Sequence, residues 1–179
     1  MKLRTRFWIL GLLVLSSAFC GAETRTITHN FQSMYDAGTL SVNTPTNTIG
    51  TIGDFEYTCG GGAEFWKTGD SGNQLAIFLN GTGKQVETTA IQNLDSICIH
   101  YYPDAAKDMS VAISSDNGSS YSDVTVKIER KGVNTVKLPT VGDYCVRIKY
   151  KSSNSVYIWK IEYFYIDLSD CPNCFIYKP

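Results

Sequence analysis

The sequence has little of what enzymes and nucleic-acid-binding proteins usually carry. Only two of its 179 residues are histidine, and 16 lysines and arginines are balanced by 17 aspartates and glutamates. With a formal net charge of −1 there is no cationic surplus to bind a phosphate backbone, so nucleic acid is not an expected partner. The one cationic cluster beyond the N-terminus, Lys127, Arg130 and Lys131, is typical of a solvated hairpin end.

Long apolar runs are also scarce. The longest, residues 7–15, is about nine residues long, whereas a membrane-spanning helix needs roughly 20. Three cationic residues precede it and small residues follow it, which is the order of a secretory signal peptide. We therefore expect residues 1–22 to be cleaved after Ala22, no transmembrane segment, and an exported protein that is secreted, periplasmic or held at the cell surface.

Lipidation of Cys20 is an alternative use of the same leader. Bacterial lipoprotein signals place a small residue directly before that cysteine, where this chain has Phe19, and an aliphatic residue where it has Ser17. Simple cleavage is therefore preferred. Cleavage removes three positive charges, takes the formal net charge from −1 to −4, and leaves a length that suits one domain with a core.

An odd number of cysteines remains after the leader. They are Cys59, Cys98, Cys145, Cys171 and Cys174. An oxidising compartment allows disulfides, and the odd count leaves at least one thiol free or joined to another molecule. Cys171 and Cys174 have CxxC spacing but lack the helix of a redox site and the further ligands of a zinc site. We predict a small disulfide loop between these two in a tail at residues 169–179, and the pairing of the others stays open.

Alternating apolar and polar residues separated by glycine turns fill the rest of the chain. Residues 94–102, 108–114, 123–130 and 143–150 each alternate as half-buried strands do, and nothing reads as a long helix. About ten short strands in one domain predict an all-β fold, specifically a β-sandwich of jelly-roll type over residues 23–168.

The alternation also assigns side chains to faces. In residues 94–102 it places Ile97, Ile99 and Tyr101 together, and Cys98 and His100 on the opposite face. Because Cys98 and His100 stand two residues apart, their side chains can touch. A Cys–His pair is one arrangement for nucleophilic catalysis, but a strand cysteine in an exported sandwich is more often bridged or simply packed.

Aromatic side chains recur along the last strand. Strict alternation places these on one face: Tyr157, Trp159, Ile161, Tyr163 and Tyr165. We expect that face to be core, or the floor of a concave sheet. Lys160 and Glu162 then form an exposed ladder on the other face.

Several segments, taken in chain order, resemble a known group of modules. They are Thr44-Pro45 to Gly50-Thr51-Ile52, Gly83-Lys84, Glu87-Thr88-Thr89, residues 94–102, Val111-Ala112-Ile113-Ser114-Ser115-Asp116, Val146-Arg147-Ile148-Lys149 and residues 158–163. Together they resemble the jelly-roll modules of secreted Bacteroidetes proteins, which often accompany polysaccharide-degrading enzymes. The resemblance covers most of residues 36–168 and rests on strand patterns. It implies a galactose-binding-like or carbohydrate-binding-module-like sandwich, from which the five cysteines and the CxxC tail depart.

A second resemblance is local. Residues 114–121 fit the Asp-box pattern, S-x-D-x-G-x-[S/T]-[W/Y], which sialidases repeat as a structural hairpin away from their chemistry. This chain has one copy and is too short for a propeller. We therefore expect Asp116 and its neighbouring serines to hold a turn.

Sugar recognition needs aromatic faces against C–H groups, with amides and carboxylates for the hydroxyls. Trp66 lies beside two glycine-rich loops, and Asp70 and Asn73 follow closely. We predict a non-catalytic module for a polysaccharide or surface glycan, in which Trp66 and Tyr102 stack on sugars while Asp70 and Asn73 bind hydroxyls. The sequence shows no catalytic set.

Two other functions stay open. The odd cysteine and the CxxC tail favour a structural or adhesive surface protein that acts through protein–protein contacts. A small glycoside hydrolase is the third, and it requires two carboxyl groups roughly 5 to 9 Å apart. The strand-borne candidates Glu64, Glu87, Glu129 and Glu162 show no evident pairing in the sequence.

No cofactor is expected, apart from a structural calcium ion of the kind that such sandwiches can hold. Calcium prefers hard oxygen ligands from loop carboxylates and carbonyls. Asp36, Asp54 and Asp167 are the candidates, although no EF-hand-like spacing accompanies them.

Overall fold

The computed structural model describes residues 22–38, 48–52, 55–61, 63–68, 74–102, 109–130 and 132–169. The leader up to residue 21 and residues 170–179, which include the CxxC motif, therefore lie outside the described residues. Within them no helix is long and apolar enough to cross a bilayer.

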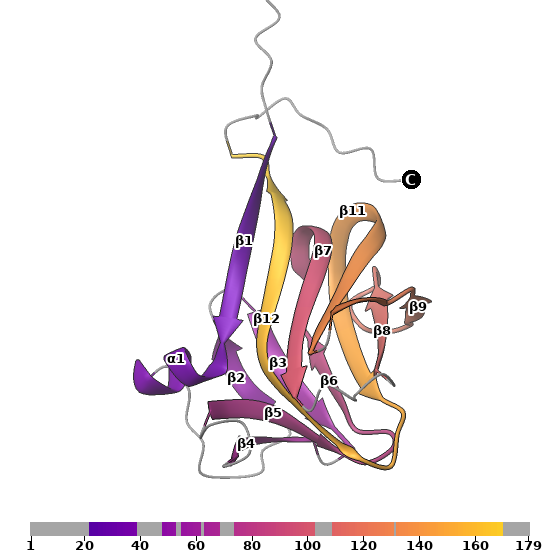
Figure 1. Ribbon diagram of the computed structural model, residues 1–179. Coiled ribbons are helices and arrows are strands. Elements are labelled where there is room, and N and C mark those ends of the chain that lie inside the picture. The colour runs from indigo at the N-terminus through magenta and orange to yellow at the C-terminus, as the bar shows by residue number, and fades with distance from the viewer. Residues whose placement is uncertain are drawn as a thin grey trace, which may run out of the picture.

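Twelve strands and one short helix make up the described chain (Figure 1). They are β1 (Glu23–Asn30), α1 (Phe31–Asp36), β2 (Thr48–Ile52), β3 (Phe55–Gly60), β4 (Glu64–Thr68), β5 (Gln74–Asn80), β6 (Gln85–Thr88), β7 (Ile91–Tyr102), β8 (Met109–Ser114), β9 (Ser122–Val124), β10 (Lys127–Arg130), β11 (Val133–Tyr150) and β12 (Ser155–Asp167). Every strand pairing is antiparallel.

The strands form two sheets that share β11. Sheet A runs β10, β11, β7, β12, and β12 then pairs with β1 and β5 along its other edge, with β4 beyond β5. Sheet B runs β2, β3, β6, β11, β8, β9. Residues 133–144 of β11 pair with β7 in sheet A, and residues 145–150 pair with β8 in sheet B. The long strand therefore ties the two sheets together (Figure 1).

A single hydrophobic core lies between the sheets. Ile97 and Ile99 of sheet A are fully buried in the same cluster as Val111, Val146 and Ile148 of sheet B. Two antiparallel sheets that each bury one face in this way form a sandwich. The predicted all-β sandwich of jelly-roll type is confirmed.

The expected aromatic face of β12 is wrong in its first half. A bulge between Ile158 and Lys160 shifts the pairing with β7, and the shift exchanges the two faces of the strand. The buried residues are therefore Val156 and Ile158 before the bulge, and Ile161 and Tyr163 after it. Tyr157, two residues before the bulged Trp159, lies on the face away from the core.

Helix α1 was not expected from the sequence. Asn30 caps it, accepting a hydrogen bond on its side chain from the Ser33 amide at 3.1 Å, and Phe31 is fully buried beneath it. Gln32 joins the helix to sheet A, because its Oε1 accepts from the Leu75 amide at 2.8 Å.

The Asp-box segment is a structural hairpin between β8 and β9, as predicted. Asp116 accepts from the amide and the hydroxyl of Ser120 at 2.9 and 2.6 Å, and Ser114 Oγ accepts from the Gly118 amide at 2.8 Å. Hydrogen bonds from Ser114 and Ser120 lower the pKa of Asp116 to about 2. Gly118 has a φ of +84°, which a residue with a side chain rarely adopts.

Candidate functional site

The four predicted sugar-binding residues are only partly described. Tyr102 ends β7 and is 41% exposed, which is unusual for a large hydrophobic side chain here. Trp66 lies in β4 opposite Ala76 of β5, and only its backbone is described. Asp70 and Asn73 lie outside the described residues. All four assignments, Tyr102 included, stay predictions.

Three aromatic residues lie side by side across sheet A on the face away from the core. Phe78 of β5 pairs with Tyr157 of β12, which pairs in turn with Tyr102 of β7. The rings of Phe78 and Tyr157 are stacked, with centroids 4.7 Å apart and an interplanar angle of 17°. Their strand neighbours Ile77 and Ile158 are fully buried, which fixes these rings on the outer face. We call Phe78, Tyr157 and Tyr102 the aromatic row.

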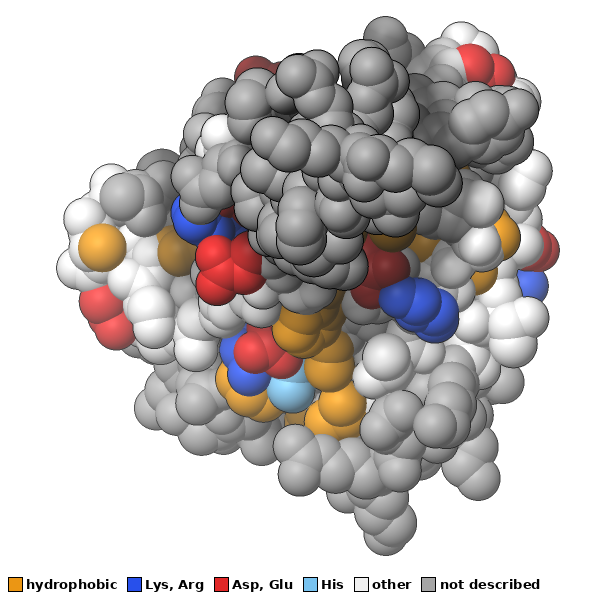
Figure 2. All heavy atoms as spheres, turned by 90° about the horizontal axis from the view of Figure 1, so that it is seen from above, with side chains coloured by type: hydrophobic (Ala, Val, Ile, Leu, Met, Phe, Trp, Pro, Cys, Tyr) orange, Lys and Arg blue, Asp and Glu red, His pale blue; other side chains and the backbone are white. Residues whose placement is uncertain are grey.

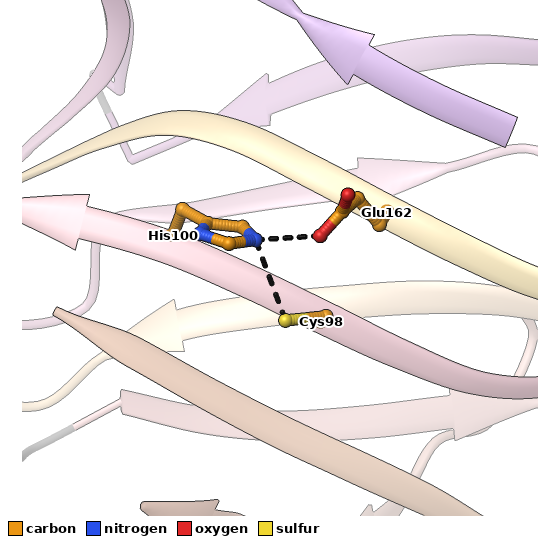
Figure 3. A group of neighbouring side chains, drawn as sticks. All are labelled: Cys98, His100 and Glu162. Carbon is orange, nitrogen blue, oxygen red and sulfur yellow. Dashed lines mark hydrogen bonds and ion pairs between the residues drawn. The ribbon is translucent and has the colours of Figure 1, made fainter. Parts of the chain in front are cut away.

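Next to the aromatic row, Cys98, His100 and Glu162 form a polar cluster (Figure 3). The sulfur of Cys98 lies 3.4 Å from His100 Nε2, and Glu162 Oε2 lies 2.6 Å from the same nitrogen. Adjacent strands position all three, because Cys98 and Glu162 are directly paired between β7 and β12. The predicted contact between Cys98 and His100 is confirmed, and Glu162 is an additional member. We call these three residues the outer cluster.

Lys160 and Trp159 flank the outer cluster. Lys160 Nζ lies 3.2 Å from Glu162 Oε1, the carboxylate oxygen that His100 does not contact. The two residues share a face as predicted, but both side chains are half-buried and not exposed. The Trp159 ring lies 5.2 Å from that of His100. Figure 2 shows a histidine side chain at the surface among acidic, basic and hydrophobic side chains. The outer face of sheet A therefore combines aromatic and charged groups.

The arrangement of the outer cluster does not suit nucleophilic catalysis. In a catalytic triad the nucleophile contacts one imidazole nitrogen and the carboxylate orients the other. Here the Cys98 sulfur and the Glu162 carboxylate meet at the same nitrogen, Nε2 of His100. Burial also raises the pKa of the Cys98 thiol, which keeps it protonated and a poor nucleophile.

Glu162 carries the negative charge of the outer cluster. Partial burial raises its pKa, but hydrogen bonds from His100 and Lys160 outweigh that effect and the pKa is lowered overall. The carboxyl group is therefore ionised at neutral pH.

A second polar group lies on sheet B. Arg147 Nε donates to Glu87 Oε1 at 2.8 Å, and the Arg147 guanidinium stacks 3.6 Å over the Tyr121 ring. Gln85 also donates to Glu87, at 2.6 Å. Burial, followed by the charge of Glu87, raises the pKa of Tyr121 to about 12. Glu87 is thus held by a cation, and it lies on a different sheet from Glu162.

The predicted calcium ligands are not brought together where they are described. Asp36 ends α1 and accepts from Gln32 at 2.7 Å, whereas Asp167 ends β12 and pairs with Arg25 at 2.9 Å. Neither belongs to a group of three possible metal ligands within the described part of the chain. Asp54 lies outside that part.

The thiols of Cys98 and Cys145 are free. Burial raises the pKa of both, so both remain protonated at neutral pH. Cys171 and Cys174 lie outside the described residues, and their disulfide stays a prediction.

The sequence reasoning missed Phe78 and Tyr157 as surface residues. The strict alternation of the last strand assigned Tyr157 to the face expected to be core, and no pattern in the sequence singled out a role for Phe78. A signal was present for Tyr157, because Val156 and Ile158 are β-branched and flank it, as strand residues of the opposite face do.

No known family model matches the chain, and no curated protein matches it. Among solved structures it is similar to a low-affinity xylan binding module, CBM86, from Roseburia intestinalis, with 12% identity over 83% of this chain and 98% of that one, and a TM-score of 0.39. It is also similar to the K2 cleaved adhesin domain of Lys-gingipain, with 14% identity, coverage of 78% and 99%, and a TM-score of 0.43.

A family two carbohydrate esterase from Cellvibrio japonicus is similar too, with 11% identity over 81% of this chain and a TM-score of 0.42. The chain spans 34% of the length of that esterase. The three structures belong to three functional classes, and at 11–14% identity the similarity concerns the fold alone.

Proposed function

We propose that the protein is a non-catalytic recognition module that binds a polysaccharide or surface glycan on the outer face of sheet A. The aromatic row supports this proposal most directly, since Phe78, Tyr157 and Tyr102 occupy paired positions on three neighbouring strands. Rings fixed on a sheet offer apolar surface at little entropic cost. The Phe78 and Tyr157 rings stack on each other, and Tyr102, which is 41% exposed, is the ring of the row best placed to pack against the C–H face of a sugar.

Polar groups border the aromatic row on both sides. Asn80 and Ser155 form the next pair along β5 and β12, where the Ser155 hydroxyl donates to Asn80 Oδ1 at 2.9 Å. On the opposite side of the row, Lys160 and Glu162 follow Tyr157 along β12. Amide, hydroxyl and charged groups can bind sugar hydroxyls, so the face offers both kinds of contact that a glycan needs.

Trp66 extends the same proposal by one strand. It lies in β4, which pairs with β5, the strand that carries Phe78. We keep Trp66 as a stacking residue, with Asp70 and Asn73 as hydroxyl ligands from the loop that follows β4.

A groove on the other side of β11 is less suited to sugars. It has a volume of about 300 Å³ and is lined by Ile113, Ser122, Asp123, Val124, Thr125, Lys137 and Pro139. None of these lining residues is aromatic, so the groove offers no ring for stacking.

Affinity electrophoresis of the purified protein against a panel of soluble polysaccharides tests the proposal. We expect retardation by one glycan class, and about tenfold weaker binding for Tyr102→Ala and for Tyr157→Ala, which corresponds to about 1.4 kcal/mol. Tyr35→Ala is the matched control, because Tyr35 is also 41% exposed but lies on α1. Trp66→Ala tests the β4 extension separately.

Three results would contradict the proposal. Unchanged binding by Tyr102→Ala and Tyr157→Ala would remove the aromatic row as the site. If no polysaccharide of the panel retards the protein, the result would favour the alternative, a surface protein that acts through protein–protein contacts. Release of reducing sugar from a bound polysaccharide would show a glycoside hydrolase instead.

A further inference from the structure

The outer cluster brings together three different metal-binding side chains on two adjacent strands. The Cys98 sulfur, His100 Nε2 and a Glu162 carboxylate oxygen all lie within 4.8 Å of one another. We propose that Cys98, His100 and Glu162 form a binding site for a divalent transition-metal ion, with Zn²⁺ as the expected occupant. This site uses none of the residues of the aromatic row, and it shares only Glu162 with the polar groups that border that row.

The three donor atoms converge on one point. Zinc bonds of about 2.0 to 2.3 Å in tetrahedral geometry place neighbouring ligand atoms about 3.3 to 3.6 Å apart. The distance from the Cys98 sulfur to His100 Nε2, 3.4 Å, already fits. Glu162 Oε2, at 2.6 Å from Nε2, must withdraw by less than about 1 Å to admit the ion. Its carboxylate is at the end of a partly exposed side chain, which can make that movement.

The chemistry of the donors favours zinc over calcium or magnesium. A sulfur, an imidazole nitrogen and a carboxylate oxygen form a mixed set of soft and intermediate ligands, whereas calcium and magnesium take oxygen ligands. Three protein ligands leave the fourth tetrahedral position to water. When the ion binds, the Cys98 thiol loses its proton to solvent and a zinc–sulfur bond forms. The proton that His100 Nε2 donates to the Glu162 carboxylate must also leave that nitrogen, and the neutral tautomer protonated at Nδ1 then offers Nε2 to the ion.

The surroundings hold the donors in place. The side chain of His100 is only 8% exposed, and the Trp159 ring packs against it with centroids 5.2 Å apart. The Thr135 hydroxyl of β11 lies 4.0 Å from the Cys98 sulfur. Because β7 lies between β11 and β12 in the sheet, the cluster is supported from both sides.

Lys160 is a cation in direct contact with the cluster. Its Nζ contacts Glu162 Oε1 and leaves Oε2 to the ion, and its flexible chain can turn toward solvent. Its charge nevertheless opposes that of the metal. Lys160→Gln should therefore raise the affinity for zinc several-fold.

Calorimetric titration of the purified, metal-free protein with ZnCl₂ tests the site. The measurements use a Cys171→Ser/Cys174→Ser background, so that the tail thiols cannot supply ligands. We expect one equivalent of zinc to bind, with at least tenfold weaker binding for Cys98→Ser and for Glu162→Gln. Titration with Co²⁺ should produce a thiolate-to-metal charge-transfer band that Cys98→Ser abolishes.

Matched controls use the same residue types on sheet B. Cys145→Ser removes a thiol of sheet B, and Glu87→Gln removes a carboxylate that Arg147 holds, so both variants should bind zinc as the parent does. Circular dichroism of every variant shows that it is folded. Absence of zinc binding by the parent, a Co²⁺ complex without the charge-transfer band, or parent-like affinity in folded Cys98→Ser would overturn the proposal.

Discussion

Each of the two histidines of the protein belongs to a polar cluster, and the two clusters differ in the groups that the imidazole contacts. In the core, His29 Nδ1 lies 2.7 Å from the Tyr57 hydroxyl, which lies 2.8 Å from the Tyr163 hydroxyl. These two hydrogen bonds connect the two sheets, because Tyr57 belongs to sheet B whereas His29 and Tyr163 belong to sheet A. We call these three residues the inner cluster. The outer cluster, by contrast, lies within sheet A and faces away from the core.

The contrast shows that burial decides what a polar cluster can do. Tyr57 and Tyr163 are fully buried and His29 is 4% exposed, so the hydrogen bonds among these groups stand in for bonds to water. Glu162 is 23% exposed on its side chain and can exchange a protein partner for water or an ion. The inner cluster therefore stabilises the fold, whereas the outer cluster can exchange its contacts for those to a bound ion.

Acid should break the inner cluster. Burial lowers the pKa of His29 from 6.5 to about 4, so the folded state keeps this imidazole neutral while the unfolded chain binds a proton. The unfolded chain then binds more protons than the folded one between pH 6.5 and about 4, so the free energy of unfolding should fall as the pH falls through that range. The loss due to His29 should reach up to about 3 kcal/mol and be complete below about pH 4. Urea unfolding across that range measures it. His29→Gln should flatten the dependence, and an unchanged slope would assign it to other groups.

Removing the central hydroxyl should have the next largest effect. Tyr57→Phe leaves His29 and the Tyr163 hydroxyl without their shared partner in the core, at a cost of about 1–3 kcal/mol. Tyr102→Phe, the same change at an exposed ring, should stay within about 0.5 kcal/mol. Urea unfolding of both variants makes the comparison, and equal costs would mean that the inner cluster contributes nothing special.

The outer cluster should tolerate change best. Glu162→Gln weakens the contacts with His100 and Lys160 on a partly exposed face, so the loss of stability in metal-free protein should stay below about 1 kcal/mol. Thermal unfolding in the presence of a chelator provides the measurement. A loss as large as that of Tyr57→Phe would show that the outer cluster is structural as well.

Local pattern was sufficient to predict strand faces and short-range contacts. Ile97, Ile99 and Tyr101 are at most 2% exposed, as their alternation predicts. Cys98 and His100 touch because they are two residues apart in a strand. These are consequences of a single strand, so no knowledge of its partners is needed.

Long-range pairing was not predictable in the same way. Glu162 reaches His100 across 62 residues through the β7–β12 register, and no sequence feature states that register. The bulge after Ile158 is equally silent, because no glycine or proline marks it. The extra residue at the bulge places Tyr157 in the aromatic row and not in the expected core. The proposed site therefore depends on the strand register, which the alternation of residues along β12 did not reveal.

The position of β12 sets the order in which the protein can fold. This last described strand pairs with β7 on one edge and with β1 and β5 on the other, and Glu23 meets Asp167 across nearly the whole domain. A ribosome therefore releases most of the chain before sheet A has its central strand. Until then three strand edges stay unpaired, which makes the nascent chain slow to fold and dependent on protection from aggregation.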